Sequence, residues 1–102
     1  LPLQCPQQHP EGESAFHLYP IVLQDTSRRL EVFNKLRAAG IGVNVHYIPV
    51  HTQPYYAKLG FKQGDFPHAE SYYAQAISLP LYYDLSEASQ AQVVNAIYQA
   101  LA

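Results

Sequence analysis

Cysteine, methionine and tryptophan are nearly absent from this chain of 102 residues, which has one cysteine and neither of the other two. Cys5 alone cannot form a disulfide within the chain, so nothing indicates an oxidising compartment, and we expect a cytoplasmic location. Position 1 is leucine rather than methionine. This fits a piece of a longer protein, and N-terminal processing would look the same.

Charged residues are also scarce, at 14% of the chain, and six basic against eight acidic residues give a formal net charge of -2. No basic run is long enough to neutralise a row of phosphates, so we do not expect nucleic acid as a partner. No apolar run approaches the roughly 20 residues that span a bilayer, and the N-terminus lacks the basic start of a signal peptide. We therefore expect no membrane partner, and the 48% of hydrophobic residues predicts one globular domain.

The strand signals are concentrated after an unstructured start. Residues 1–14 contain three prolines and many polar side chains, which predicts a linker from a missing N-terminal domain, with the folded domain at 15–102. Residues 15–24 are apolar on both alternating faces, as in a covered strand, and Pro20 should place that strand at an edge or at a bulge. The cleanest alternation is at 41–47, which predicts a second strand.

Helix signals occupy most of the remaining chain. Capping oxygens at 25–27 precede an amphipathic helix that ends at Gly40. The two arginines of its first turn, Arg28 and Arg29, are expected to be solvated, and an outside partner for one of them is the alternative. A short helical turn is expected at 54–59, a helix from Pro67 towards Ser78, and a last helix from Ser86. This order predicts an α+β fold, with helices on one face of a small sheet of two to four strands.

Several kinds of chemistry are poorly supported by these residues. His46, His51 and His68 with Glu70 form a metal-ligand set by residue type, but they have neither the helical spacing nor the cysteine pairs of known zinc sites, so we expect no metal. The chain has no Gly-x-Ser-x-Gly motif and no glycine-rich phosphate loop. Acid–base chemistry by His46 with a neighbouring tyrosine is an open alternative.

Tyrosine is the residue in excess, with three adjacent pairs at 55–56, 72–73 and 82–83. In each pair a helix or strand directs one ring inward and its neighbour elsewhere. We interpret most of these rings as core and interface filler, because a tyrosine combines an apolar body with a polar tip. A subunit contact or a sugar site is the alternative interpretation.

Three runs in order carry a family resemblance: Gly40-Ile-Gly-Val-Asn-Val-His-Tyr-Ile-Pro49, Phe66-Pro-His-Ala-Glu70 and Ala76-Ile-Ser-Leu-Pro-Leu-Tyr82. They resemble the C-terminal small domain of the DegT/DnrJ/StrS nucleotide-sugar aminotransferases, which are pyridoxal-phosphate (PLP) enzymes of fold type I. The run from Val43 to His51 looks most like the branch that aminates a UDP-linked 4-keto-6-deoxy-N-acetyl sugar for pseudaminic acid.

The resemblance implies where this chain would act. In the family the turn after the second strand faces the active site, so Val45, His46, Tyr47 and Ile48 would contact the sugar nucleotide rather than transfer protons. The resemblance also implies PLP, an amino-acid donor such as glutamate, and a homodimer, all in the full-length parent. The cofactor-binding lysine and phosphate cup of the large domain have no match here, since neither Lys35, Lys58 nor Lys62 lies in the family's motif. The chain alone is therefore expected to bind no cofactor and to be inactive.

A second function remains open from the sequence. A self-standing α+β module that binds a ligand or regulates a partner would have the same composition and the same order of elements, and its fold alone would not reveal its ligand.

Overall fold

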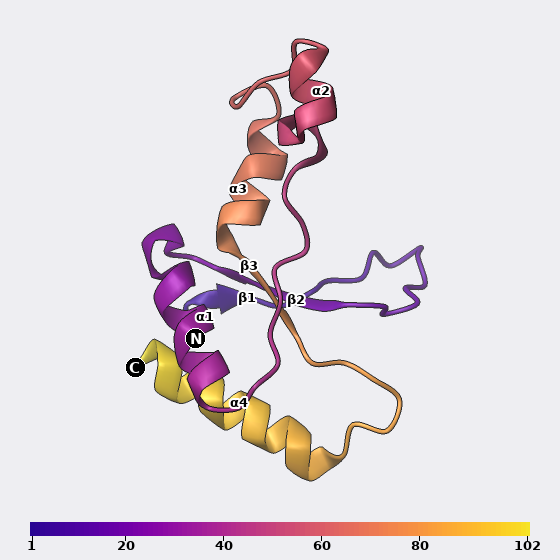
Figure 1. Ribbon diagram of the computed structural model, residues 1–102. Coiled ribbons are helices and arrows are strands. Elements are labelled where there is room, and N and C mark those ends of the chain that lie inside the picture. Colours follow the sequence, from indigo (N-terminus) through magenta and orange to yellow (C-terminus); the bar gives the residue numbers. More distant parts are fainter.

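The computed structural model describes residues 1–102. Two helices lie on one side of a small sheet, and the other two extend away from its opposite side (Figure 1). The class is α+β, as predicted, with three strands and four α-helices. The strands are β1 (Leu3–Gln4), β2 (Tyr19–Leu23) and β3 (Ala76–Leu79), and the helices are α1 (Arg29–Ala38), α2 (Pro54–Lys58), α3 (Pro67–Gln75) and α4 (Glu87–Leu101), with 3-10 turns η1 (Thr26–Arg28) and η2 (Val50–Thr52).

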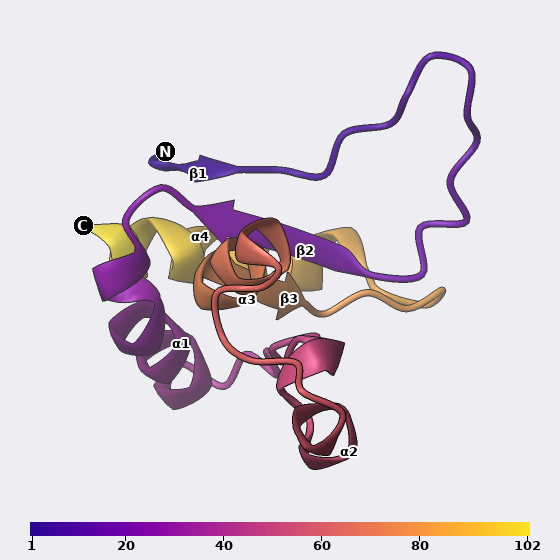
Figure 2. The same cartoon turned by 90° about the horizontal axis from the view of Figure 1, so that it is seen from above.

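The sheet is antiparallel in the order β1-β2-β3 (Figure 2). β2 is thus the central strand, and the prediction that Pro20 would put it at an edge was wrong. β1 pairs only with Leu23 and Val22, so it ends before it reaches Pro20. On the other side Pro20 faces Ser78, whose backbone N–H and C=O both bond to Asn44 instead. Pro20 therefore occupies a position where the ladder requires no N–H.

The segment 41–47 does not form the predicted strand. Its one ladder contact is the Asn44–Ser78 bridge, on the outer side of β3. The alternation reports burial correctly only as far as Asn44, because Ile41 and Val43 are buried and Gly42 and Asn44 exposed, whereas Val45 and His46 are both half-buried and Tyr47 is exposed. An alternating pattern records which side chains face the core, and a passing loop can satisfy it without a strand partner. The first 14 residues also differ from a plain linker, since Leu3–Gln4 form β1.

Both predicted side-chain caps form, but only Ser86 caps an α-helix directly, because Asp25 caps the 3-10 turn η1 that leads into α1. The Asp25 carboxylate accepts hydrogen bonds from the Ser27 hydroxyl at 2.6 Å and the Ser27 backbone N–H at 2.9 Å, which lower the pKa of Asp25. The hydroxyl of Ser86 accepts from the backbone N–H of Ser89 at the start of α4. After α1 the chain turns at Gly40, whose φ of +82° suits a residue without a Cβ.

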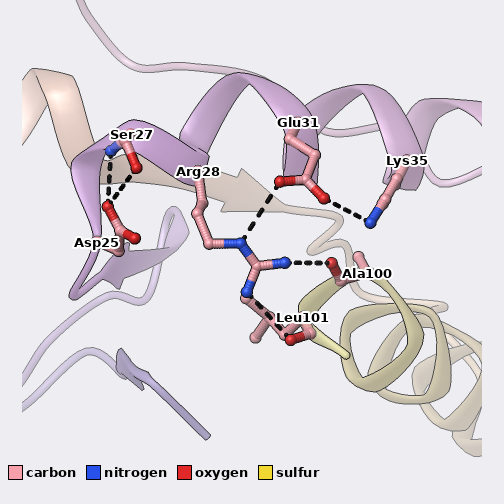
Figure 3. A network of polar contacts seen from close by, with 7 residues as sticks. All are labelled: Asp25, Ser27, Arg28, Glu31, Lys35, Ala100 and Leu101. Atoms are coloured by element: carbon pink, nitrogen blue, oxygen red, sulfur yellow. Dashed lines mark hydrogen bonds and ion pairs between the residues drawn. The ribbon is translucent and has the colours of Figure 1, made fainter.

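The two arginines at the start of α1, Arg28 and Arg29, are half-buried and both have partners, so the expectation that the pair is solvated was wrong. Arg28 donates to the carbonyl oxygens of Ala100 and Leu101 in the last turn of α4, and it also contacts Glu31 (Figure 3). Arg29 donates to the carbonyl oxygen of Tyr73 near the end of α3, and its guanidinium lies over the Tyr73 ring. Each cation thus meets the negative end of a helix dipole, which compensates for its position at a helix start.

The helix expected to run towards Ser78 ends at Gln75, and the chain continues directly as β3. Pairing with β2 overrides the helical signal there, since β3 supplies the buried side chains Ala76, Ile77 and Ser78. None of the four helices has both the length and the apolar character needed to cross a membrane. The core lies between the sheet, α1 and α4, and its buried members are Ile21, Leu23, Val32, Leu36, Ile41, Val43, Ile77, Val93, Ala96, Ile97 and Ala100.

Candidate functional site

The candidate substrate segment, Val45–Ile48, begins where the chain leaves the sheet. Asn44 and Ser78 exchange two backbone hydrogen bonds, with N···O distances of 3.1 Å and 2.7 Å. One residue later the chain has no further pairing with β3. The segment is therefore anchored at one end by the sheet and is otherwise free to present its side chains.

His46 is held by one of its two ring nitrogens. Its Nδ1 lies 2.8 Å from the hydroxyl oxygen of Ser78, a buried side chain on β3. Its Nε2 makes no hydrogen bond within the protein, and it is not among the buried polar atoms that lack a partner. Nε2 of His46 therefore reaches the surface, where it can meet a ligand.

The other three residues of the segment differ in exposure. Val45 is half-buried, whereas Tyr47 and Ile48 expose 69% and 51% of their surface. The Tyr47 ring stands edge-on to the His46 ring, with centroids 4.5 Å apart. An exposed phenol, an accessible imidazole nitrogen and an apolar side chain thus follow one another along four residues, a combination suited to binding a molecule with both polar and apolar parts.

Only one predicted residue lines the groove that adjoins the segment. This groove has a volume of about 530 Å³ and lies between the start of α1, the segment after Tyr47, and α3. Ile48 is part of its wall, but Val45, His46 and Tyr47 are not. The other lining residues are Thr26, Ser27, Arg29, Leu30, Pro49, Thr52, Gln63, Glu70, Tyr73 and Ala74.

The four residues considered as metal ligands do not form one cluster, because only His51 and Glu70 lie close to each other. Nε2 of His51 lies 3.4 Å from a carboxylate oxygen of Glu70, without the alignment of a hydrogen bond. Glu70 instead accepts the backbone N–H of Gly64 with both oxygens, at 2.8 Å and 2.9 Å. No group of three His, Cys, Asp or Glu side chains is placed to hold an ion. His51 and Glu70 thus act as a polar contact between η2 and α3.

A PLP site does not fit the residues present in this chain. A Schiff-base lysine needs a free amine in a pocket, but Lys35 is paired with Glu31 at 2.6 Å and Lys62 with Asp65 at 3.3 Å. Lys58 is exposed at the end of α2, and none of the three lysines lines the groove beside α3 or the three other hollows, near Phe61, Pro80 and Gln92.

Sequence reasoning did not find the partner of His46. From the sequence, Ser78 was expected only at the end of the helix that begins at Pro67, and it lies 32 residues from His46 along the chain. The contact follows from the pairing of Asn44 with Ser78, which no local pattern predicts. A weak signal was the period of two, which places Asn44 and His46 on the same face once Asn44 is paired.

Comparisons of this chain with known proteins all indicate the same family. The model of the DegT/DnrJ/EryC1/StrS aminotransferase family matches residues 1–98. The spore coat polysaccharide biosynthesis protein SpsC of Bacillus subtilis (strain 168) is 39% identical over 100 residues, which are 93% of this chain and 26% of that protein. A UDP-4-amino-4,6-dideoxy-N-acetyl-beta-L-altrosamine transaminase of Campylobacter jejuni subsp. jejuni serotype O:2 is 34% identical over 76 residues, which are 72% of this chain and 20% of that protein.

A solved structure supports the same assignment. The fold matches DesV of S. venezuelae, solved in complex with a ketimine intermediate, with a TM-score of 0.88 and 31% identity over 98% of this chain and 27% of that chain. This likeness confirms the expected aminotransferase small-domain fold. The chain spans about a quarter or less of the length of these relatives. Because the family model covers nearly all of its residues, the chain belongs to the DegT/DnrJ/EryC1/StrS aminotransferase family.

Proposed function

We propose that this chain serves as the C-terminal small domain of a PLP-dependent nucleotide-sugar aminotransferase and contributes the Val45–Ile48 segment to its substrate site. The observation that carries the proposal is the family match over residues 1–98, together with a segment that presents an accessible imidazole nitrogen and an exposed phenol. The domain at 15–102 would pack against a large N-terminal domain, with 1–14 as the connection.

The proposed substrate is a UDP-linked 4-keto-6-deoxy-N-acetyl sugar, and the product is UDP-4-amino-4,6-dideoxy-N-acetyl-β-L-altrosamine. The run from Val43 to His51 and the similarity to the Campylobacter transaminase support this choice. SpsC, which is more identical, is named for a spore coat polysaccharide instead. The substrate can be decided by comparing the rates at which the parent enzyme aminates UDP-sugars and other nucleotide sugars. Glutamate as the donor, a homodimer and a cytoplasmic location belong to the same proposal.

Each residue of the segment has a binding role in this proposal. His46 Nε2 and the Tyr47 hydroxyl form hydrogen bonds that fix the orientation of the sugar nucleotide, and Ile48 supplies apolar contact at the edge of the groove. PLP, held by the other domain of the parent, supplies the amino-group transfer chemistry when it is bound. Nothing in this chain replaces the lysine that such a cofactor requires.

The first test is the reading frame that encodes the chain. A parent with several hundred further residues that include a lysine-bearing cofactor site agrees with the proposal, whereas a start codon directly before Leu1 contradicts it. The second test is His46→Ala in that parent. A lost hydrogen bond to a neutral or a charged group should lower kcat/KM by about 2- to 150-fold, while the absorbance of the bound cofactor stays unchanged.

His68→Ala is the matched control, because His68 is exposed in the first turn of α3 and forms no side-chain hydrogen bond. We expect its kinetics to equal those of the unchanged enzyme. Unchanged kinetics for His46→Ala would remove His46 from the substrate site. Complete loss of activity would indicate proton transfer by His46 instead, and loss of the cofactor spectrum with normal folding would place His46 on the cofactor.

A further inference from the structure

We propose that Ser78 is a positioning residue that fixes the tautomer of His46, so that Nε2 carries the proton and donates to an acceptor oxygen of the ligand. The inference deepens the proposed function, since it rests on His46 facing the substrate. It specifies which kind of atom the ligand must present to this nitrogen.

The geometry around Ser78 restrains the imidazole through both backbone and side chain. The Ser78 backbone exchanges two hydrogen bonds with Asn44, two residues before His46 in the chain. Its side-chain oxygen lies 2.8 Å from Nδ1 of His46. The backbone pair thus fixes where the segment leaves the sheet, and the side-chain contact separately fixes the orientation of the imidazole, so both restraints come from one residue.

The direction of the Ser78–His46 bond follows from the donors and acceptors available. A serine hydroxyl has one proton to donate, and Ser78 is only 4% exposed, so water is a poor acceptor for it. Its side chain makes no other hydrogen bond, and its neighbours on the same face of the sheet include Pro20, Val22 and Ala76, whose side chains carry no acceptor. A buried hydroxyl without an acceptor is destabilising. The hydroxyl therefore donates to Nδ1, and Nδ1 carries no proton.

The acceptor role of Nδ1 determines where the proton of the His46 ring lies. A neutral imidazole has one proton, so when Nδ1 accepts, Nε2 is the N–H donor. The ligand atom that meets His46 must then be an acceptor, such as a phosphate, carbonyl or hydroxyl oxygen of a nucleotide sugar. The same arrangement disfavours neutral His46 as a general base at Nε2, because the lone pair needed for that role is on Nδ1 and is occupied by Ser78.

The tautomer can be measured directly in the chain without substrate. Long-range ¹H–¹⁵N correlation spectra of ¹⁵N-histidine-labelled protein distinguish the Nε2–H from the Nδ1–H form, at a pH well above about 6.5, where histidine is neutral. The signal of His46 is identified by its loss in His46→Ala. We expect an almost pure Nε2–H form. A predominant Nδ1–H form would overturn the proposal.

Two variants of Ser78 test its part. Ser78→Ala should leave a mixture of tautomers and a more mobile ring, whereas Ser78→Thr, which keeps the hydroxyl, should retain the unchanged pattern. Ser71→Ala is the control, since Ser71 is an exposed serine on α3. If the spectrum of Ser78→Ala is identical to that of the unchanged protein, the positioning role of Ser78 is refuted. If Ser78→Ala does not fold, Ser78→Thr still decides, because a mixture in that variant contradicts the proposal.

Kinetics in the parent separate this inference from the proposed function. Ser78→Ala should lower kcat/KM by about 2- to 10-fold, with no further loss when it is combined with His46→Ala. If His46→Ala alone has no effect, the substrate role fails while the tautomer measurement still stands. If Ser78→Ala lowers activity equally in both backgrounds, Ser78 does not act through His46, and the inference fails while the substrate role of His46 stands.

Discussion

The molecule consists of two regions that are held together by different forces. The body, comprising the sheet with α1 and α4, contains the whole apolar core. The arm, residues 49–75, contains η2, α2 and α3, and neither α-helix of the arm has a buried residue. The arm extends from the body in Figure 1, and the radius of gyration of 15.4 Å exceeds the roughly 13 Å typical of a compact domain of this length. Apolar burial stabilises the body, whereas a few polar contacts and small aromatic contacts hold the arm.

The contrast extends to side chains of the same type. In the arm, Tyr55 and Leu59 expose more than half of their surface, while the large aliphatic side chains of the body, such as Ile21 and Ile77, are almost fully buried. Two residues in the arm are buried, Pro49 and His51, and His51 packs against Phe66 and Glu70 within the arm itself. The arm is therefore the region whose stability should respond to polar substitutions, and the body the region that should respond to changes of volume.

The largest effect is expected from a cavity in the body. Ile77→Ala removes a side chain that is completely buried between the sheet and the helices, and should lower the free energy of unfolding by about 2–5 kcal/mol. Leu30→Ala is the matched control, because Leu30 is 67% exposed on α1 and should change stability by less than about 0.5 kcal/mol. Chemical denaturation measures both. Equal losses for the two variants would show that the division into body and surface is wrong.

The next effect should be confined to the arm. Glu70→Ala removes the acceptor of the Gly64 N–H and the anion beside His51, and should destabilise the arm locally by about 1–3 kcal/mol. Faster hydrogen exchange at the Gly64 amide, with unchanged protection at Ile77, is the expected result. Glu13→Ala, in an exposed loop, is the control. Loss of protection in both regions would mean that arm and body unfold as one unit.

The smallest effect concerns the contact that joins the start of α1 to the end of α4. Arg28→Ala should cost about 0.5–2 kcal/mol, because the carbonyl oxygens of Ala100 and Leu101 lose their cation. Arg37→Ala on the exposed side of α1 should cost less. Exchange of the amides in the last turn of α4 and the thermal midpoint measure the change. An effect of Arg37→Ala equal to that of Arg28→Ala would contradict the role assigned to Arg28.

Local chemistry predicted the helices better than it predicted the pairing. Ser86 caps α4 and Pro67 begins α3 because their effects act within one turn of the chain. The ends of β3 depend on a partner more than 50 residues away, and the central place of β2 depends on β3 and also on β1, which no local pattern reports. For the same reason His46 was identified through the family motif, whereas its contact with Ser78 became visible only in the fold.

The Asn44–Ser78 pair also defines a closed loop, which contains both the candidate substrate segment and the arm. The entropic cost of closing a flexible loop rises slowly with loop length, by only about 0.6 kcal/mol for each doubling. Insertions or deletions between residues 45 and 75 should therefore disturb the body little, provided that the backbone pairing of Asn44 with Ser78 is kept. Substrate specificity can therefore change through replacement of this one contiguous segment, while the apolar core that stabilises the body remains the same.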